Sequence, residues 1–249
     1  MDTAIDIKDI SRPPRDLVDQ LAGIGSATLS SELNRHFGLR DPQIRGPRPL
    51  KKGRTVAGPA LTLQCMPKRE DLYGDDEYRD PERQLHRHVL YPTQPGDVVV
   101  VDARGDLGSG IFGEMMLTFF AGQGGAGVIV DGCIRDSAKA AELDIGIWVK
   151  DVTPNYHAQT NIIPFAVNVP IACGGVLVMP GDIIVADDDG VVIVPVAFAA
   201  PLAEIAGQHA EWEEFARLRL AAGGHLRKYY PLNAEGEAEY RAWREAQTR

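Results

Sequence analysis

The sequence is poor in cysteine. Its 249 residues include three, Cys65, Cys133 and Cys173, and no two of them have the spacing of a metal site or a redox pair. An odd number of scattered cysteines is typical of reduced thiols, so we expect a cytoplasmic protein without a disulfide framework. An apolar leader is also missing from residues 1–15, so we expect no secretory signal there.

Long hydrophobic runs and an excess of positive charge are lacking as well. No apolar stretch approaches the roughly 20 residues of a membrane-spanning helix, so we expect no membrane partner. The formal charge of -9 argues against a nucleic-acid-binding surface, although a small basic patch around an anionic substrate stays compatible with it. Hydrophobic content of 44% and charged content of 24% are ordinary, and the chain is long enough for one large domain.

The stretch from residue 95 to residue 136 carries most of the predicted chemistry. Its pattern is strand, glycine-rich turn, helix, strand and turn, over residues 97–102, 103–110, 111–122, 128–130 and 131–136. Both strands are β-branched apolar runs of the buried kind. In an open α/β sheet, ligands bind beyond the carboxyl ends of such strands, where helix N-termini point.

Three kinds of group would meet at that edge. The unbonded amides of residues 113–116 favour an anion such as a carboxylate. Arg135 offers a planar fork of donors that suits a carboxylate or a keto oxygen. Asp136 and Glu114 are oxygen ligands or water-holding groups suited to Mg²⁺ or Mn²⁺. The combination describes a site for a metal-bound 2-oxo acid.

Each residue also has an ordinary structural role open to it. Asp136 precedes a helical pattern at 137–143 and could be its N-cap. Glu114 could complement a helix dipole, and Arg135 could be a solvated turn residue. The occurrence of all three at two strand ends favours the functional interpretation.

The remaining pattern is that of an α/β chain. Helices are expected over 15–21, 26–37 and 198–222, and strands over 55–65, 145–149, 165–178, 183–185 and 191–194. Gly58 and Pro59 interrupt the first strand, which indicates an edge or a bulge. Residues 187–190 favour a hairpin turn over a calcium loop. We expect one domain over 1–225 and an extension over 226–249 that either lies on a neighbouring subunit or covers the core.

Two further segments lie between the first strand and the central unit. Residues 66–80 are charged and predict a solvated surface insertion, with a lid over a pocket as the alternative. A helix is expected to begin at Pro81 and to carry His86 and His88. Histidines two positions apart do not share a helix face, so we interpret them as surface residues, with Arg83 or Arg87 a weaker candidate for substrate contact.

Three segments carry a resemblance to a known family: residues 113–116, 124–136 and 142–146. They resemble the class II pyruvate aldolases, which include the 4-hydroxy-4-methyl-2-oxoglutarate and 4-carboxy-4-hydroxy-2-oxoadipate aldolases. The protein called regulator of ribonuclease activity A resembles them too and is grouped with them. The most specific motif is Glu114 followed, after twenty residues, by Arg135 and Asp136. The resemblance extends over about residues 15–225.

The resemblance implies a swivelling β/β/α-type fold: a single α/β domain with a mixed central sheet, helices packed around it and a C-terminal helical extension. It also implies a homotrimer or homohexamer with active sites between subunits. Asp136 would bind Mg²⁺ or Mn²⁺, Arg135 would contact the substrate, and Glu114 would orient a metal-associated water. Glu211 or Glu213 would reach in from a neighbouring subunit. The substrate-binding residues expected on this basis are Gly113, Met115, Met116, Arg104 and Arg135.

The implied reaction is the cleavage of a 4-hydroxy-2-oxo acid to pyruvate and a carbonyl product through a stabilised enolate, with oxaloacetate decarboxylation as a second activity. A Schiff-base aldolase is an alternative that needs a desolvated lysine, for which Lys139 and Lys150 are the candidates. A second alternative is a non-catalytic protein that binds a ribonuclease. A third is a lyase or hydratase on sugar-derived 2-oxo acids, in which Arg104, Arg69 or Arg87 contacts a longer substrate.

Overall fold

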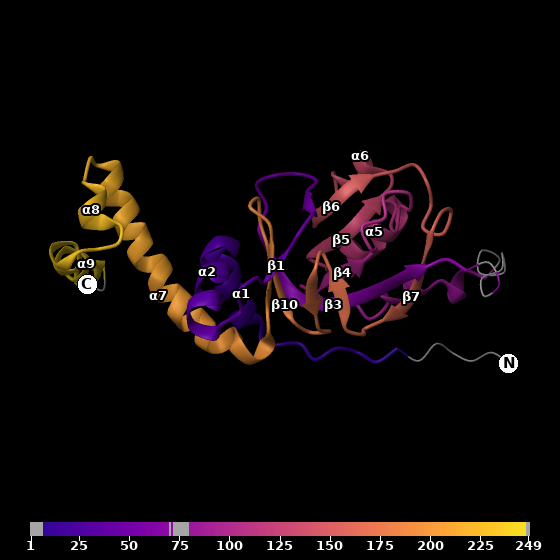
Figure 1. The fold of residues 1–249 in the computed structure, drawn as a ribbon, viewed down its shortest axis with the longest axis horizontal. Helices are drawn as coiled ribbons and strands as arrows, with labels where there is room; N and C mark the ends of the chain where they lie inside the picture. Colours follow the sequence, from indigo (N-terminus) through magenta and orange to yellow (C-terminus); the bar gives the residue numbers. More distant parts are fainter. Residues whose placement is uncertain (1–6, 70, 72–79, 248–249) are drawn as a thin grey trace.

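A mixed β-sheet forms the centre of the molecule (Figure 1). The computed structural model describes residues 7–69, 71 and 80–247. Within them, nine strands form a sheet in the order β1-β11-β10-β3-β4-β5-β6-β2, with β7 also paired to β3. These strands are β1 (Gln43–Ile44), β2 (Arg48–Pro49), β3 (Val56–Pro67), β4 (Val98–Asp102), β5 (Gly127–Ile134), β6 (Gly146–Val152), β7 (Ile162–Val167), β10 (Ile183–Ala186) and β11 (Val191–Val194). A separate hairpin joins β8 (Ile171–Cys173) to β9 (Val176–Val178).

The parallel part of the sheet consists of β3, β4, β5 and β6. Every residue of β4 and β5 is buried, as expected for strands covered on both faces. The mixed α/β architecture predicted from the sequence is therefore confirmed. The turn at 187–190 is also confirmed, because β10 and β11 are antiparallel neighbours joined by it.

Strand β3 departs from the sequence expectation of an edge strand. It lies in the middle of the sheet, between β10 and β4. Pro59 is accommodated because the ladder with β4 begins one residue later, at Ala60. The register shift in β3 falls between Gln64 and Cys65, where β3 pairs with β7, and not at Gly58. Gly58 instead permits a close approach, since a Cβ there would lie 1.9 Å from the carbonyl oxygen of Gly96.

Helices α1 (Arg15–Ile24), α2 (Ser26–Phe37) and α7 (Val196–Ala221) lie together on the β10–β11 side of the sheet (Figure 1). Buried side chains from all three helices and both strands form one apolar cluster. Ser26 is the first residue of α2, and Gly25 in the N-cap position has no side chain to cap the helix. The carboxylate of Asp187 takes that role, accepting bonds from the Ser26 amide at 2.8 Å and from its hydroxyl at 2.6 Å.

The opposite side of the sheet carries shorter helical elements. They are η1 (Pro81–Arg83), α4 (Leu85–His88), α5 (Glu114–Gly122) and α6 (Ser137–Ala140). Helix α5 starts three residues after the predicted start at Ile111. Helix α6 is shorter than the predicted 137–143. Apolar residues of α5 and α6, with Val89 and Leu90 just after α4, join β3, β4, β5 and β6 in the largest core cluster.

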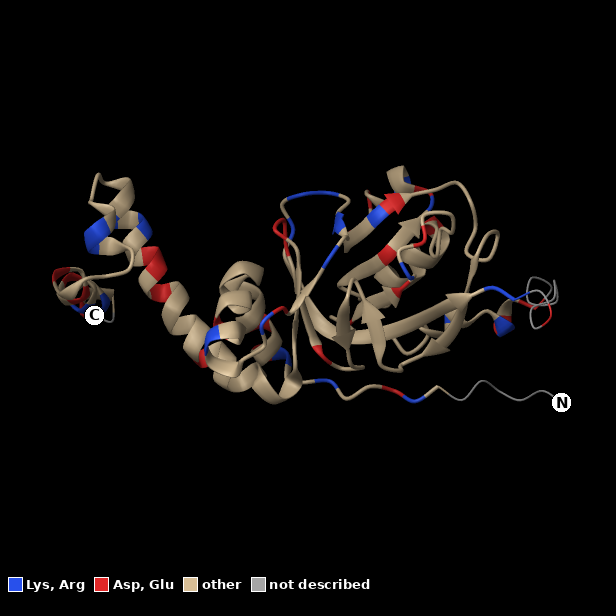
Figure 2. Ribbon diagram, viewed as in Figure 1, with Lys and Arg blue, Asp and Glu red and all other residues tan. Residues whose placement is uncertain are grey.

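The C-terminal segment forms a third packing unit, away from the sheet (Figure 1). Helices α8 (Leu226–Tyr229) and α9 (Ala234–Gln247) pack on the far end of α7, where Phe215 and Tyr229 are buried in a separate cluster. Lys228 of α8 pairs with Glu235 and Glu239 of α9 at 3.2 and 2.9 Å, among the mixed charges of this region (Figure 2). The segment therefore packs on α7 of its own chain and not on the core.

The charged 66–80 segment falls mostly outside the described residues, so its interpretation as an insertion or a lid stays a prediction. Among the helices of the described chain, none combines the length and the apolar character needed to cross a bilayer. The three cysteines are buried and unpaired, as expected, and burial raises the pKa of each thiol above its usual value.

Candidate functional site

The site is assembled where the glycine-rich segment before α5 meets the end of β5. The sequence interpretation placed residues 131–136 in a turn, but β5 continues to Ile134. The extra residues have a partner: the amide of Ile111 donates to the carbonyl of Cys133 at 3.0 Å, and the amide of Arg135 donates to the carbonyl of Phe112 at 2.9 Å. This short parallel pairing brings the N-terminus of α5 beside Arg135 and Asp136.

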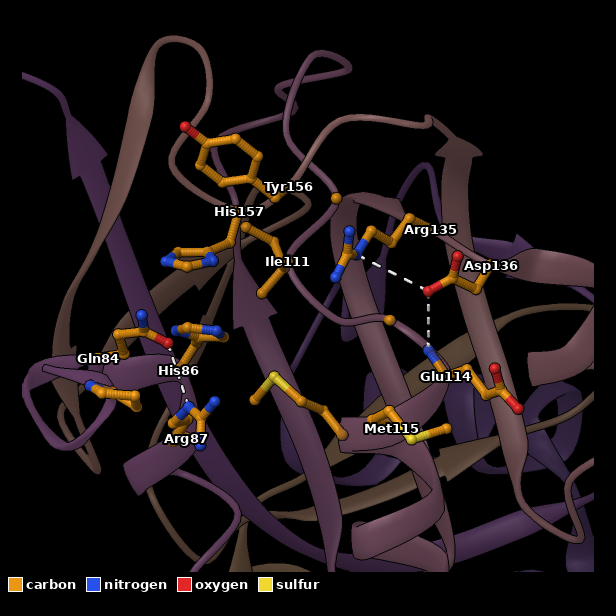
Figure 3. Close-up of a pocket in the computed structure, with 14 residues that line it drawn as sticks. Gln84, His86, Arg87, Ile111, Glu114, Met115, Arg135, Asp136, Tyr156 and His157 are labelled. Atoms are coloured by element: carbon orange, nitrogen blue, oxygen red, sulfur yellow. Dashed lines mark hydrogen bonds and ion pairs between the residues drawn. The ribbon is translucent and has the colours of Figure 1, made fainter. Parts of the chain in front are cut away.

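Asp136 caps a different helix from the one that follows it. Its backbone is left-handed, with φ 56° and ψ 35°, a conformation that aspartate tolerates better than most residues. Its side chain makes no capping bond to α6. It accepts a bond from the amide of Glu114 at 3.2 Å, at the N-terminus of α5 (Figure 3). The Asp136 carboxylate is thus the anion bound by the Glu114 amide, one of the amides predicted to face an anion.

Gly113 separates this carboxylate from the Arg135 guanidinium. A Cβ at position 113 would lie 2.6 Å from Asp136 Oδ2 and 2.9 Å from Arg135 Nε. Arg135 Nε is 3.8 Å from Asp136 Oδ2, and both side chains are 45% exposed. The hollow left by the missing Cβ is therefore lined by an anion and a neighbouring cation, both reachable from solvent.

Glu114 contributes mainly through its backbone. Its side chain turns away from Asp136 (Figure 3) and pairs with Lys139 at 2.9 Å. That contact raises the pKa of Lys139, whose side chain is 67% exposed. Lys150 forms an ion pair with Asp131. A Schiff-base nucleophile needs a lowered pKa, so the raised pKa of Lys139 and the ion pair of Lys150 argue against that alternative.

A cavity of about 420 Å³ opens beside these residues. Helix α5 supplies Met115 and Met116, and the segment before it supplies Gly110, Ile111 and Gly113. The facing wall comes from η1, α4 and the β6–β7 loop. Its polar residues, which we call the histidine wall, are Gln84, His86, Arg87, Tyr156 and His157 (Figure 3).

The histidine wall was largely missed by the sequence interpretation, which placed His86 on the surface. His86 is 3% exposed and stacks on His157, with ring centroids 3.7 Å apart. Burial lowers the pKa of His86 well below its usual value and that of His157 to about 4, and the positive charges of Arg135 and Arg87 add to the effect on His157. Both rings are therefore neutral at pH 7. The sequence signal available was the basic run that includes Arg87, which had been marked as a weaker candidate.

Two predicted site residues lie elsewhere in the described chain. Arg104 is exposed, has a left-handed backbone with φ 58°, and is not among the residues lining the cavity. Glu211 lies on α7 and pairs with Arg244 of α9 at 3.0 Å, on the part of the molecule remote from α5 (Figure 1). Its predicted role from a neighbouring subunit stays a prediction.

The chain's own oxygen donors form an incomplete set of metal ligands. Among the described residues, no group of three or more His, Cys, Asp or Glu side chains is placed to hold a metal ion. Asp136 lies in the hollow at Gly113 with its carboxylate part-exposed. One carboxylate completed by waters and substrate oxygens is a usual arrangement for Mg²⁺, so the donor chemistry fits a hard divalent cation.

The comparisons with known proteins agree with this fold. The model of the RraA-like family, described as Aldolase/RraA, matches residues 16–193. A curated relative from Halalkalibacterium halodurans, named "Putative 4-hydroxy-4-methyl-2-oxoglutarate aldolase", is 37% identical over 148 residues. That match covers 59% of this chain and 63% of the relative, so the chain spans less than two thirds of the relative's length.

Two solved structures resemble the chain over most of their length. The first is Streptomyces coelicolor RraAS2, described as an unusual member of the RNase ES inhibitor RraA protein family. It is 44% identical, with a TM-score of 0.76, and the match covers 84% of this chain and 99% of that one. The second is the RNA-processing inhibitor RraA from Thermus thermophilis, 26% identical with a TM-score of 0.51, covering 67% and 92%. Because the family model matches most of its length, the chain belongs to the RraA-like (Aldolase/RraA) family.

Proposed function

We propose that the chain is a metal-dependent lyase that cleaves a 4-hydroxy-2-oxo acid to pyruvate and a carbonyl product. The observation that carries the proposal is the close approach at Gly113, where Asp136 Oδ2 and Arg135 Nε lie 3.8 Å apart beside a position that only glycine leaves open. The aldolase name of the curated relative supports the same reaction class. We further propose that the protein is cytoplasmic and works as a homotrimer or homohexamer.

In this mechanism Arg135 binds the substrate's keto and carboxylate oxygens. The amides of Met115 and Met116 lie in the first turn of α5, so they lack acceptors within the helix and can donate to the substrate carboxylate. Asp136 would hold Mg²⁺ or Mn²⁺. When bound, the cation supplies Lewis-acid polarisation of the keto group and lowers the pKa of an associated water.

Bond cleavage needs two proton movements. The C4 hydroxyl of the substrate gives its proton to a water, the C3–C4 bond breaks to leave a C4 carbonyl, and the electron pair of that bond moves into the enolate of pyruvate. Arg135 stabilises the negative charge on the enolate oxygen with a guanidinium that is positioned before the reaction. C3 then takes up a proton from water. Glu114 would orient the water in these transfers, which requires its carboxylate to leave Lys139.

The same enolate forms when oxaloacetate loses CO₂, because the electron pair of the broken bond again enters the enol system. Decarboxylation of oxaloacetate is therefore part of the proposal. It needs Arg135 but no base for a C4 hydroxyl.

The test is pyruvate release from a panel of 4-hydroxy-2-oxo acids and oxaloacetate, with and without Mg²⁺ or Mn²⁺. We expect activity that depends on the cation and that falls by roughly 10²-fold or more in Asp136→Ala, the order of loss seen when a group that stabilises developing charge is removed. Asp144→Ala is the matched control, since that carboxylate is 98% exposed and pairs with Arg54 away from the cavity. Full activity in Asp136→Ala would show that the site is elsewhere.

A second function is favoured by the structural neighbours, which are described as inhibitors of an RNase and of RNA processing. The chain would then bind a ribonuclease without catalysis. Capture of a purified bacterial ribonuclease by the chain, together with no turnover of any 2-oxo acid in the panel, would select this function over the lyase.

A further inference from the structure

The histidine wall faces the Arg135–Asp136 side of the cavity (Figure 3) and has no part in the chemistry described above. The cavity of about 420 Å³ leaves room beyond Arg135 for more than the pyruvyl half of a substrate. Whatever lies between the two sides must extend from the reacting carbon towards His157, His86 and Arg87. The wall therefore contacts the half of the substrate that leaves as the carbonyl product.

Arg87 gives this wall a positive charge. Its Nε donates to the neutral side-chain oxygen of Gln84 at 3.1 Å, and within the described part of the chain no carboxylate forms a direct ion pair with it. The nearby Glu82 carboxylate accepts from the Tyr91 hydroxyl at 3.0 Å, and that hydroxyl also interacts with Arg87. Arg87 and Arg135 both exert a positive field on His157, and two guanidinium groups near one buried ring make the wall attractive to an anion.

The histidine pair also contains an unsatisfied polar atom. His86 Nδ1 is buried, and it has no hydrogen-bond partner among the described residues. Leaving such an atom unpaired costs about 1–3 kcal/mol, so a wall that contains one is poorly explained by packing alone. His86 lines the cavity and lies against His157, so this nitrogen belongs to the wall that a substrate would meet.

From these observations we infer that His86, Arg87 and His157 are specificity-determining residues that bind an oxyanion on the leaving half of the substrate. The inference rests on the proposed lyase function and assigns the substrate selectivity of the same cavity. The neutral imidazoles donate or accept one hydrogen bond each, and Arg87 supplies the charge. A substrate with a carboxylate at C4 would bind across the cavity between Arg135 and Arg87.

The test compares two substrates that differ in one group: 4-hydroxy-2-oxopentanoate, with a methyl at C4, and 4-hydroxy-2-oxoglutarate, with a carboxylate there. We expect the full-length chain to prefer the second by about tenfold or more in kcat/KM, since a charge-assisted hydrogen bond contributes at least that factor. Arg87→Gln and His157→Gln should bring the ratio towards one, mainly by raising KM for the glutarate, because the contact is made in both ground and transition states. Arg87→Lys should restore part of the preference.

Arg83→Gln is the matched control, because Arg83 is exposed on the adjoining turn of η1 and does not line the cavity. It should keep the parent ratio. Equal cleavage of both substrates by the parent, or an equal loss for both in Arg87→Gln and His157→Gln, would overturn the role of the wall while leaving the lyase intact. Release of pyruvate from neither substrate would overturn the lyase function, and the wall's role with it.

Discussion

Gly113→Ala is the sharpest perturbation of the site, because it changes one atom at the point where Asp136 and Arg135 approach each other. The added Cβ would lie 2.6 Å from Asp136 Oδ2, and an ordinary contact begins at 3.4 Å, so the carboxylate must retreat by about 0.8 Å. The same movement stretches its 3.2 Å bond to the Glu114 amide. Arg135 Nε, at 2.9 Å, must move as well.

The cost of this variant should appear in activity and hardly at all in stability. Gly113 has φ -117° and ψ -179°, an extended conformation that alanine adopts freely. Asp136 and Arg135 are 45% exposed and can rotate outward, so we expect the free energy of unfolding to change by less than about 1 kcal/mol. A misplacement of roughly 1 Å in a catalytic group can cost about 10²-fold, and we expect that loss in kcat/KM for pyruvate release.

Gly122→Ala provides the control at the other end of α5. A Cβ there meets nothing within 4 Å, so activity should be unchanged and stability equal or slightly higher. The measurements are pyruvate release at saturating Mg²⁺ and urea unfolding of both variants. Parent-like kcat/KM in Gly113→Ala would refute the reasoning, since it would mean that the position of these two side chains does not matter.

Four further predictions follow from the contacts described. The pKa of His157 is about 4 in the folded chain and near 6.5 in the unfolded chain, so the stability that its neutral form contributes is present above pH 6.5 and lost as the pH falls towards 4. In urea unfolding, His157→Gln should reduce the change in unfolding free energy over that pH range by up to about 3 kcal/mol. Glu32 is 2% exposed and contacts His209 at 2.8 Å, so Glu32→Ala should lower the free energy of unfolding by about 2 kcal/mol in the same assay. A chain ending at Gly224 should lower the thermal midpoint by no more than about 4 °C, as 1 kcal/mol does in a domain of this size, because the C-terminal cluster is separate from the core. EDTA should abolish pyruvate release, and borohydride with pyruvate should leave Lys139 unmodified in a mass spectrum, whereas a trapped adduct would establish the Schiff-base route.

The parts of the fold that were predictable are those fixed by local pattern. Strands β4 and β5 were recognised because a strand buried on both faces must be apolar at every position. The presence of a helix after the glycine-rich segment, though not its exact start, and the hairpin at 187–190 were also local features. Pro59 misled the interpretation because its position in the sheet depends on which residue of β3 first pairs with β4, and that register is set by tertiary contacts.

The histidine wall could not be predicted from the local sequence pattern. His86 and His157 are far apart in the sequence, and they meet only because α4 packs on β7 and the β6–β7 loop folds back over it. Helix α4 has a single turn, so the rule that separates residues two positions apart onto different faces gave no information about which of His86 and His88 points inward. No periodicity exists in four residues from which burial could be inferred.

For Asp136, the structure changes the interpretation that the sequence allowed. Its place before a helical pattern made it a candidate N-cap of α6, and that choice was reasonable from sequence. The pairing of Ile111 and Phe112 with the end of β5 holds the following turn, and the left-handed backbone of Asp136 then directs its carboxylate to α5. A capping residue could be any short polar side chain. The Asp136 carboxylate, in contrast, is held at the end of another helix, beside Arg135 and next to a position that requires glycine, so it is constrained by both charge and shape. That double constraint, and not the motif alone, is why we propose a catalytic role for the site.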